Sequence, residues 1–334
     1  MKKLTYLPFL LFTALLLWQC ARERPQALSG EMTRQLALLP LSGISGETPA
    51  GLGYINLERM RQSAIYAMLQ DSLRERMHGE KELDELAEAT GFDFRKDMKE
   101  VYLAFEPGPE RREGNFLVVA IGKYDSQRIM DFVAKENTGK QLTPESYNEA
   151  TLYRVEDKPF VLGFADEAYA VGGKEQWVKS WLDNFRAAKS EVTLDPDLAE
   201  RLKPLKYKTG AWLVMDPTHL VNAIMDEMPE DADARRFEAL RAVRNLNFSM
   251  DMGEEIKFDG LGQFTDAEKA KLFHDMVKGA LATVKLSLSG DRAAIDVMNK
   301  IHLKTDGNNV KIDGEMSRED LEKLIRRQHG LALR

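Results

Sequence analysis

The chain contains one cysteine among its 334 residues, so no disulfide can form within it and packing alone must hold the fold. It has one long apolar run, Leu4 to Trp18, and no second stretch near the roughly 18 apolar residues that would span a membrane. Basic runs interleaved with aromatic residues are also absent, and the formal net charge is −7. Because nucleic-acid binding depends on Lys and Arg neutralising phosphates, this composition argues against nucleic acid as a partner.

Several catalytic motifs are missing as well. The sequence has no G-x-x-x-x-G-K-[ST] phosphate loop, no G-x-S-x-G nucleophile elbow and no H-E-x-x-H zinc motif. Its five histidines lie far apart, and none has a second histidine at ligand spacing. We therefore predict no metal site and no cofactor. A hydrolase whose carboxylates or triad meet only in the folded chain stays open, because such groups need no local motif.

The N-terminal residues have the pattern of an export signal. Lys2 and Lys3 precede the apolar run, which is too short for a comfortable membrane span, and Cys20 follows directly after it. We place the signal peptide at residues 1–19. Removing it takes away two lysines and no acids, which moves the net charge from −7 to −9. Residues 20–48 are punctuated by Ser-Gly pairs and prolines and read as a tether.

The segment Leu17-Trp18-Gln19-Cys20 resembles the lipobox of bacterial lipoproteins, in which an aliphatic residue stands three before the lipidated cysteine. The resemblance implies lipidation of Cys20 and a membrane partner, because several acyl chains at about 0.8 kcal/mol per methylene anchor a protein stably. Trp18 and Gln19 stand where lipoboxes have small residues, so an ordinary secretory signal and an uncleaved anchor remain alternatives. Ala21, in place of an aspartate, favours the periplasmic face of the outer membrane over the inner membrane.

The rest of the chain shows an internal repeat, which divides it into units at 49–190 and 191–334. Three pairs of segments recur in the same order: a strand entering a helix, a second strand entering a helix, and a hairpin before a final helix. They are 53–60 with 212–220, 115–126 with 255–266, and 152–164 with 301–314. The pattern predicts an α+β fold of two tandem similar units, with mostly antiparallel sheets and helices packed on one face.

Capping patterns and periodicity set the boundaries of individual elements. Asp216 and Asp125 are expected to cap helices, and Thr265 with Glu268 forms a capping box. We expect one helix over residues 57–78. Residues 266–289 alternate like a strand near their end, but no turn precedes that part, so we interpret them as helical.

The body resembles an uncharacterised family of bacterial envelope proteins that share a domain of unknown function. The likeness rests on Gly53 to Ser63, the Gly91-Phe92-Asp93 segment within Thr90 to Phe94, Gly122 to Phe132, and His302 to Leu321. The resemblance implies the fold and a place in the cell envelope, and it brings no activity, cofactor or catalytic residue.

One side-chain pattern is a candidate binding surface. Trp177, Trp181 and Phe185 recur at every fourth position and would form a stripe along one face of a helix. Such a stripe packs into the core or, if exposed, binds a partner or an acyl chain. We therefore expect a lipid-anchored envelope protein that binds an unknown protein or lipid and is not an enzyme. The alternatives are the dispersed hydrolase and a structural subunit of an envelope complex.

Overall fold

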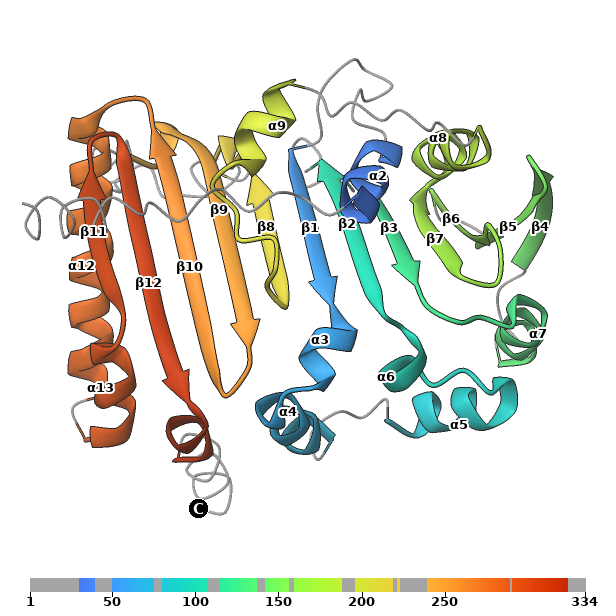
Figure 1. Ribbon diagram of the computed structural model, residues 1–334, viewed down its shortest axis with the longest axis horizontal. Coiled ribbons are helices and arrows are strands. Elements are labelled where there is room, and N and C mark those ends of the chain that lie inside the picture. Colours follow the sequence, from blue (N-terminus) through green and yellow to red (C-terminus); the bar gives the residue numbers. More distant parts are fainter. Residues whose placement is uncertain are drawn as a thin grey trace, which may run out of the picture.

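The computed structural model describes residues 30–39, 50–74, 80–106, 114–136, 142–155, 159–187, 196–218, 221–222, 239–288 and 290–323. Twelve strands form one sheet in the order β11-β12-β10-β9-β8-β1-β2-β3-β7-β6-β5-β4, and Figure 1 shows helices around it. All neighbouring strands pair in antiparallel fashion. The α+β class with antiparallel pairing is confirmed.

The strands before residue 190 are β1 (Gly51–Asn56), β2 (Glu100–Glu106), β3 (Asn115–Ile121), β4 (Leu142–Tyr147), β5 (Ala150–Val155), β6 (Phe160–Phe164) and β7 (Tyr169–Lys174). Those after it are β8 (Ala211–Met215), β9 (Val243–Met252), β10 (Glu255–Phe264), β11 (His302–Asp306) and β12 (Asn309–Ser317). The helices are α2 (Gly30–Leu38), α3 (Leu57–Arg61), α4 (Ala64–Arg74), α5 (Glu80–Thr90), α6 (Phe94–Asp97), α7 (Ser126–Glu136), α8 (Glu175–Arg186), α9 (Pro196–Leu202), α12 (Ala267–Ser287) and α13 (Arg292–Asn299).

The two predicted units share this sheet and do not form separate ones. β1 pairs with β8 near the middle of the sheet. From this pair outward, each half places three strands in sequence and then a hairpin whose second strand is the inner one: β1-β2-β3-β7-β6 and β8-β9-β10-β12-β11. The hairpin that occupies the position of β11–β12 is thus β6–β7, whereas the sequence match between 152–164 and 301–314 predicts β5–β6 there. The local sequence pattern cannot show which of the two hairpins takes this position, because the position of β7 is set by its pairing with β3, a strand distant in sequence. A common origin of the two halves stays a prediction.

Side-chain caps begin several helices where the sequence predicts them. The Oδ1 of Asp125 accepts the Arg128 amide at 3.0 Å, and that of Asp216 accepts the Thr218 amide at 2.9 Å. The predicted cap at Thr265 is wrong by one residue, because Asp266 accepts the amide of Lys269 and caps α12. The stretch that the sequence predicts as helical, residues 266–289, contains α12 (Ala267–Ser287), and residue 289 lies outside the described residues.

The helix predicted over residues 57–78 is interrupted. α3 ends after Arg61, and the Ser63 hydroxyl then accepts the amide of Ile65 at 3.1 Å, which starts α4. A serine hydroxyl competes with the helical backbone for such amides, and this competition breaks the periodic pattern into two helices.

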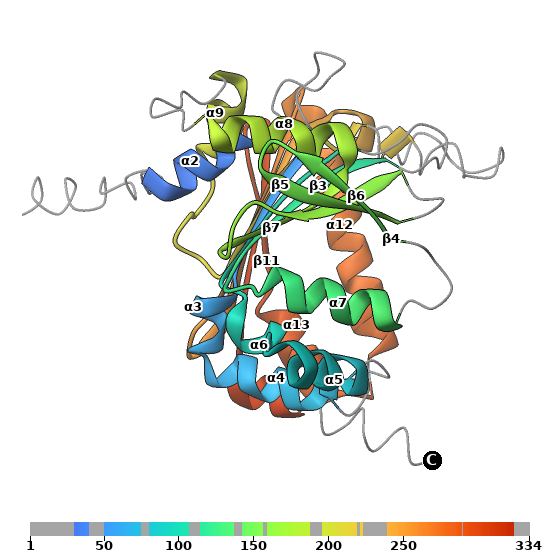
Figure 2. The same cartoon turned by 90° about the vertical axis from the view of Figure 1, so that its right-hand side faces the viewer.

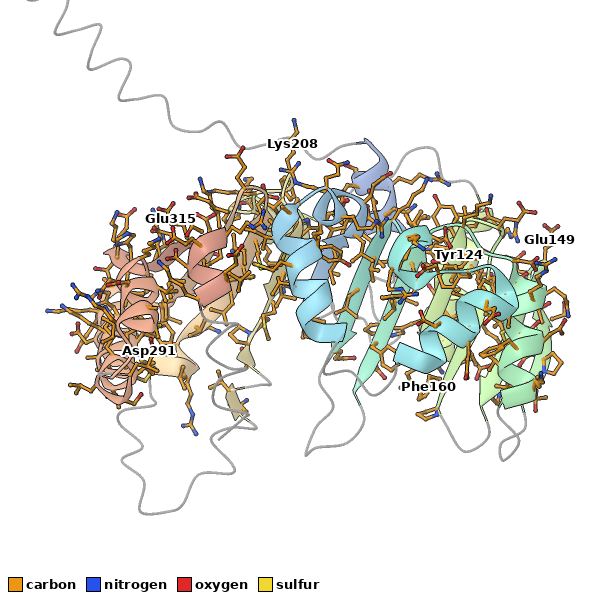
Figure 3. The ribbon with its side chains drawn as sticks, turned by 90° about the horizontal axis from the view of Figure 1, so that it is seen from below. Tyr124, Glu149, Phe160, Lys208, Asp291 and Glu315 are labelled. Atoms are coloured by element: carbon orange, nitrogen blue, oxygen red, sulfur yellow. The ribbon has the colours of Figure 1, made fainter. Side chains whose placement is uncertain are left out.

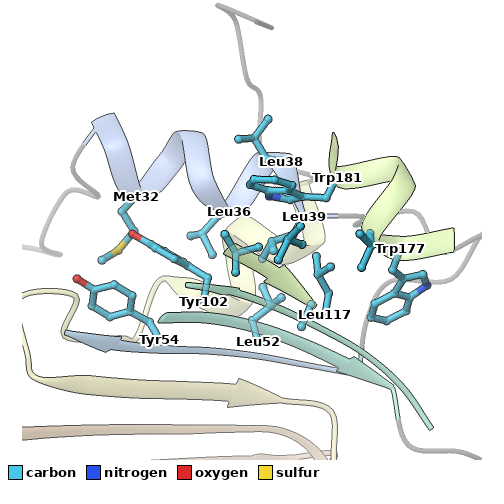
Figure 4. Close-up of a cluster of buried hydrophobic side chains, with 14 of the residues drawn as sticks. Met32, Leu36, Leu38, Leu39, Leu52, Tyr54, Tyr102, Leu117, Trp177 and Trp181 are labelled. Atoms are coloured by element: carbon cyan, nitrogen blue, oxygen red, sulfur yellow. The ribbon is translucent and has the colours of Figure 1, made fainter. Parts of the chain in front are cut away.

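The largest core cluster lies on the front face of the sheet, which we define by Leu52, Tyr54, Tyr102 and Leu117. Figure 4 shows α2 and α8 packed over these residues. Part of the predicted tether is therefore ordered against the sheet: in and just after α2, Leu36, Leu38 and Leu39 are at most 2% exposed. Residues 1–19 and Cys20 lie outside the described residues.

Helices cover both faces of the sheet, which corrects the expectation of one. In Figure 2, α2 and α9 lie on one side of the strands, and α12 and α7 lie on the other. Phe264 and Ala270 join α12 to the back face, while Tyr124 and Ile129 join the α7 region to it. A sheet with two apolar faces needs cover on both, and local helix periodicity does not reveal which face a helix chooses.

Candidate functional site

The predicted tryptophan stripe does not form a binding surface. Trp177 and Trp181 are 3% and 0% exposed and pack into the front core from α8. Phe185 is half-buried, and its ring stacks on Trp181 with centroids 4.9 Å apart. Tyr169 lies 5.0 Å from the Phe185 ring, and the guanidinium of Arg34 covers it at 5.9 Å. The periodicity thus marks the buried side of α8, which was the other reading of the stripe.

The sheet offers a different apolar surface, on the back face. The registers align one residue from each of the twelve strands in a single row, and none of the twelve carries a charge. In sheet order the row is Leu303, Ile312, Gly260, Phe248, Leu213, Gly53, Leu103, Val118, Gly172, Leu162, Tyr153 and Pro144. The facing row on the front, offset by one residue, carries Lys304 and Lys311 at one end and Arg154 near the other.

The back-face side chains in this row are left partly exposed. Phe248 and Leu162 are 40% and 36% exposed, and Leu213, Leu103 and Val118 are half-buried. On the same strands, the front-face neighbours Val214, Leu52 and Leu117 are at most 1% exposed. Burying an apolar side chain of this size contributes about 1.5–3 kcal/mol. Because these back-face side chains stay partly exposed, the described chain gains only part of the free energy that their full burial would contribute.

Aromatic rings extend this surface along the strands. Phe248 stacks on Phe258 with centroids 6.3 Å apart, and the Phe258 ring lies where a side chain on Gly314 would project. A Cβ on Gly51 would stand 2.1 Å from the Phe105 ring, so the end of that ring occupies the space beside the glycine backbone. Rings that cover glycines in neighbouring strands give the back face a smooth, uncharged surface.

We define the back-face patch as the residues between the cover provided by α12 and that provided by α7. It comprises Ile55, Leu103, Phe105, Phe116, Val118, Leu162, Leu213, Phe248, Met250 and Phe258. Periodicity could have indicated it, because strands such as 211–215 and 100–106 are apolar on both alternating faces. Which of these faces is left uncovered depends on the helices, and these pack through long-range contacts.

A polar cavity of about 520 Å³ lies beside the start of α7. Lys123 and Arg128 line it together with Asp97, Asp125 and Glu167, and Asp125 pairs with Arg128 at 3.4 Å. Burial raises the pKa of the Tyr124 hydroxyl, which also belongs to this lining, so the phenol stays protonated. Charges of both signs compensate one another here, and the lining specifies no class of ligand.

The histidines give no evidence of a catalytic site in the described ranges. The Nδ1 of His274 lies 3.0 Å from the Oδ1 of the adjacent Asp275, and His302 is exposed at the start of β11. His78, His219 and His329 lie outside those ranges. Among the described residues, no group of three or more His, Cys, Asp or Glu side chains could hold a metal ion. Within those residues, none of the helices is both long and apolar enough to cross a membrane.

Comparisons with known proteins add a structural likeness. No family model and no curated protein matches the chain. The crystal structure of TP0453 in crystal form I is similar with a TM-score of 0.46 and 13% sequence identity, covering 86% of this chain and 98% of that one. The resemblances to bacterial lipoproteins and to the uncharacterised envelope family stay predictions.

Proposed function

We propose that this protein is held at the cell envelope by a lipid on Cys20 and works by binding a hydrocarbon ligand on the back-face patch. The uncharged row across twelve strands, with Phe248 and Leu162 partly exposed, is the observation that carries the proposal. Large exposed apolar patches on soluble domains mark binding surfaces for lipids or proteins. A lipidated N-terminus would keep the patch beside a source of hydrocarbon chains, the membrane itself.

The energetics favour a flexible chain as the occupant. Each methylene removed from water contributes about 0.8 kcal/mol, so a chain that lies along several strands gains affinity in proportion to its length. The row offers uncharged contacts over its whole length and, among its members, only Tyr153 carries a side-chain hydrogen-bonding group. Such a surface selects for hydrophobicity and for length. It supports binding without chemical conversion of the ligand.

A charge placed in the patch tests this function. The full-length protein, purified in a mild non-ionic detergent and captured on an affinity resin, is incubated with radiolabelled hexadecanol, and retained label is counted. Phe248→Asp should lower retention at least tenfold, because the new carboxylate must lose its water when the chain binds. Phe248 is 40% exposed, so the variant should keep the fold, which circular dichroism checks.

Leu286→Asp is the matched control, because Leu286 is 74% exposed on α12 and lies outside the patch. It should retain hexadecanol at the level of the unaltered protein. Equal losses in both variants, or no retention by the unaltered protein above an empty resin, would contradict the proposed function. Retention of a protein partner that occludes the patch, with hexadecanol unable to compete, would instead support the structural-subunit alternative.

A further inference from the structure

A cavity of about 300 Å³ lies where the back-face patch ends, beside β3, β6 and β7. Phe116 and Phe160 line it with ring centroids 5.9 Å apart, and by register both belong to the back face, next to Phe105 and Leu162. Figure 3 labels Phe160 in this part of the molecule. The remaining described lining is Gly114, Asn115, Pro159 and Lys174. The apolar surface therefore continues into a cavity whose described lining contains one cation, Lys174.

The cation is held in place by a chain of hydrogen bonds. Asn115 Nδ2 donates to Glu106 Oε2 at 2.8 Å, which fixes the amide so that its Oδ1 accepts from Lys174 Nζ at 2.6 Å. Among the described residues no carboxylate lies within ion-pair distance of Lys174, and the hydrogen-bond partner of its Nζ is the neutral Oδ1 of Asn115. An ammonium group carries three N–H donors, and two of them stay available to a ligand.

An ammonium at the end of an apolar surface complements an amphiphile with one negative charge. We propose that the Lys174 cavity binds the carboxylate of a long-chain fatty acid whose hydrocarbon chain lies on the back-face patch. This inference rests on the proposed function and names its ligand class. A carboxylate has two oxygens to satisfy, which the remaining N–H groups of Lys174 can do. A phosphate monoester presents three terminal oxygens, more than the two remaining N–H groups of Lys174, and sites for such groups use arginine forks or several amides.

Two ligands of equal chain length distinguish the contribution of the head group to binding from that of the hydrocarbon chain. The full-length protein is captured as for hexadecanol, and radiolabelled palmitate and hexadecanol are compared. The unaltered protein should retain about tenfold more palmitate than hexadecanol, because a charge-assisted hydrogen bond is lost with the alcohol. Lys174→Gln should lower palmitate to the level of hexadecanol and leave hexadecanol unchanged. Lys174→Arg should restore most of the difference, since it keeps the charge.

Lys123→Gln is the matched control, because Lys123 lines the polar cavity beside α7 and not this one. It should leave the retention of both ligands unchanged. If Lys174→Gln retains palmitate like the unaltered protein while Phe248→Asp still lowers hexadecanol, the head-group site is refuted and the proposed function survives. If Phe248→Asp retains both ligands like the unaltered protein, the head-group site and the proposed function are both refuted. Stronger retention of phosphatidylglycerol than of palmitate would overturn the carboxylate assignment.

Discussion

At the scale of single residues, the carboxylate of Asp93 is stabilised in its charged form at the start of α6, close to the sheet. Burial alone would raise the pKa of its carboxyl, but hydrogen bonds from Arg95 and Lys96 outweigh burial and hold the pKa at about 2. Its Oδ1 accepts from the Arg95 amide at 3.0 Å and from Arg95 Nε at 2.8 Å. The carboxylate thus caps α6 and binds the adjacent guanidinium, with 13% of its side chain exposed.

The depressed pKa of Asp93 predicts an acid-labile contribution to stability. The folded pKa of about 2 lies below the ordinary value of 3.8, so the contribution is complete above about pH 5 and is lost as the pH falls through 2. The difference corresponds to about 2 kcal/mol. Asp93→Asn should therefore flatten the fall in urea midpoint between pH 4 and pH 2. Asp131→Asn, on the exposed side of α7, should reproduce the unaltered pH dependence; an identical slope in Asp93→Asn would contradict the assignment.

At the scale of elements, the turn from β7 into α8 depends on a single glycine. Gly173 has a φ of +147°, and a Cβ there would stand 2.1 Å from the carbonyl oxygen of Phe116 on β3. The backbone of β7 can approach β3 this closely only without a side chain. This approach also fixes Lys174, the next residue and the N-cap of α8.

Gly173→Ala should destabilise the protein strongly. The backbone conformation alone costs an L-residue about 1–3 kcal/mol, and the overlap with Phe116 adds to it because backbone cannot move aside cheaply. Thermal and urea midpoints measure the loss. Gly253→Ala is the control: Gly253 has nothing within 4 Å of an added Cβ and has no positive φ, so the change should be within about 0.5 kcal/mol. Equal midpoints for the two variants would show that β7 can shift.

Sequence patterns predicted most individual elements, because their signals are local. The strand before Asn56, the caps at Asp125 and Asp216, and the amphipathic α8 all follow from neighbours within a few residues. The site was not predictable in the same way. The tryptophan stripe of α8 is compatible with a buried face and with a binding surface, and only the sheet beneath it decides between the two. The back-face patch joins side chains from strands far apart in sequence, and only their registers align them.

At the scale of the whole molecule, the β1–β8 pairing makes the two halves interdependent. Tyr54 on β1 stacks on Trp212 of β8 with centroids 5.6 Å apart. Arg59, just after β1, donates to both carboxylate oxygens of Asp251 on β9 at 2.9 Å. The hydrogen bonds from Arg59 hold the pKa of Asp251 below its usual range. The halves therefore share backbone hydrogen bonds, an aromatic contact and an ion pair.

A chain that ends at residue 190 should not form a stable monomer. Without β8, the backbone groups of Gly51–Ile55 that pair with it become an open edge, and open edges pair with other chains. We expect oligomers by light scattering and fast amide exchange in β1. Adding residues 191–334 as a separate chain should restore protection in β1 if the halves dock in the same register. A monomeric fragment with protected β1 amides would show that the first half folds alone.

The docking of α2 sets how far the body can stand from the membrane. Leu36 and Leu38 are buried against the sheet, so a lipid on Cys20 would be separated from the folded body by residues 21–29 only. An extended chain spans at most about 3.5 Å per residue, so residues 21–29 could reach roughly 30 Å at most. A protein anchored in this way would exchange ligands with the leaflet that holds it and would not carry them across to another membrane. If Cys20 is lipidated, the packing of α2 against the sheet would therefore limit where the protein can act.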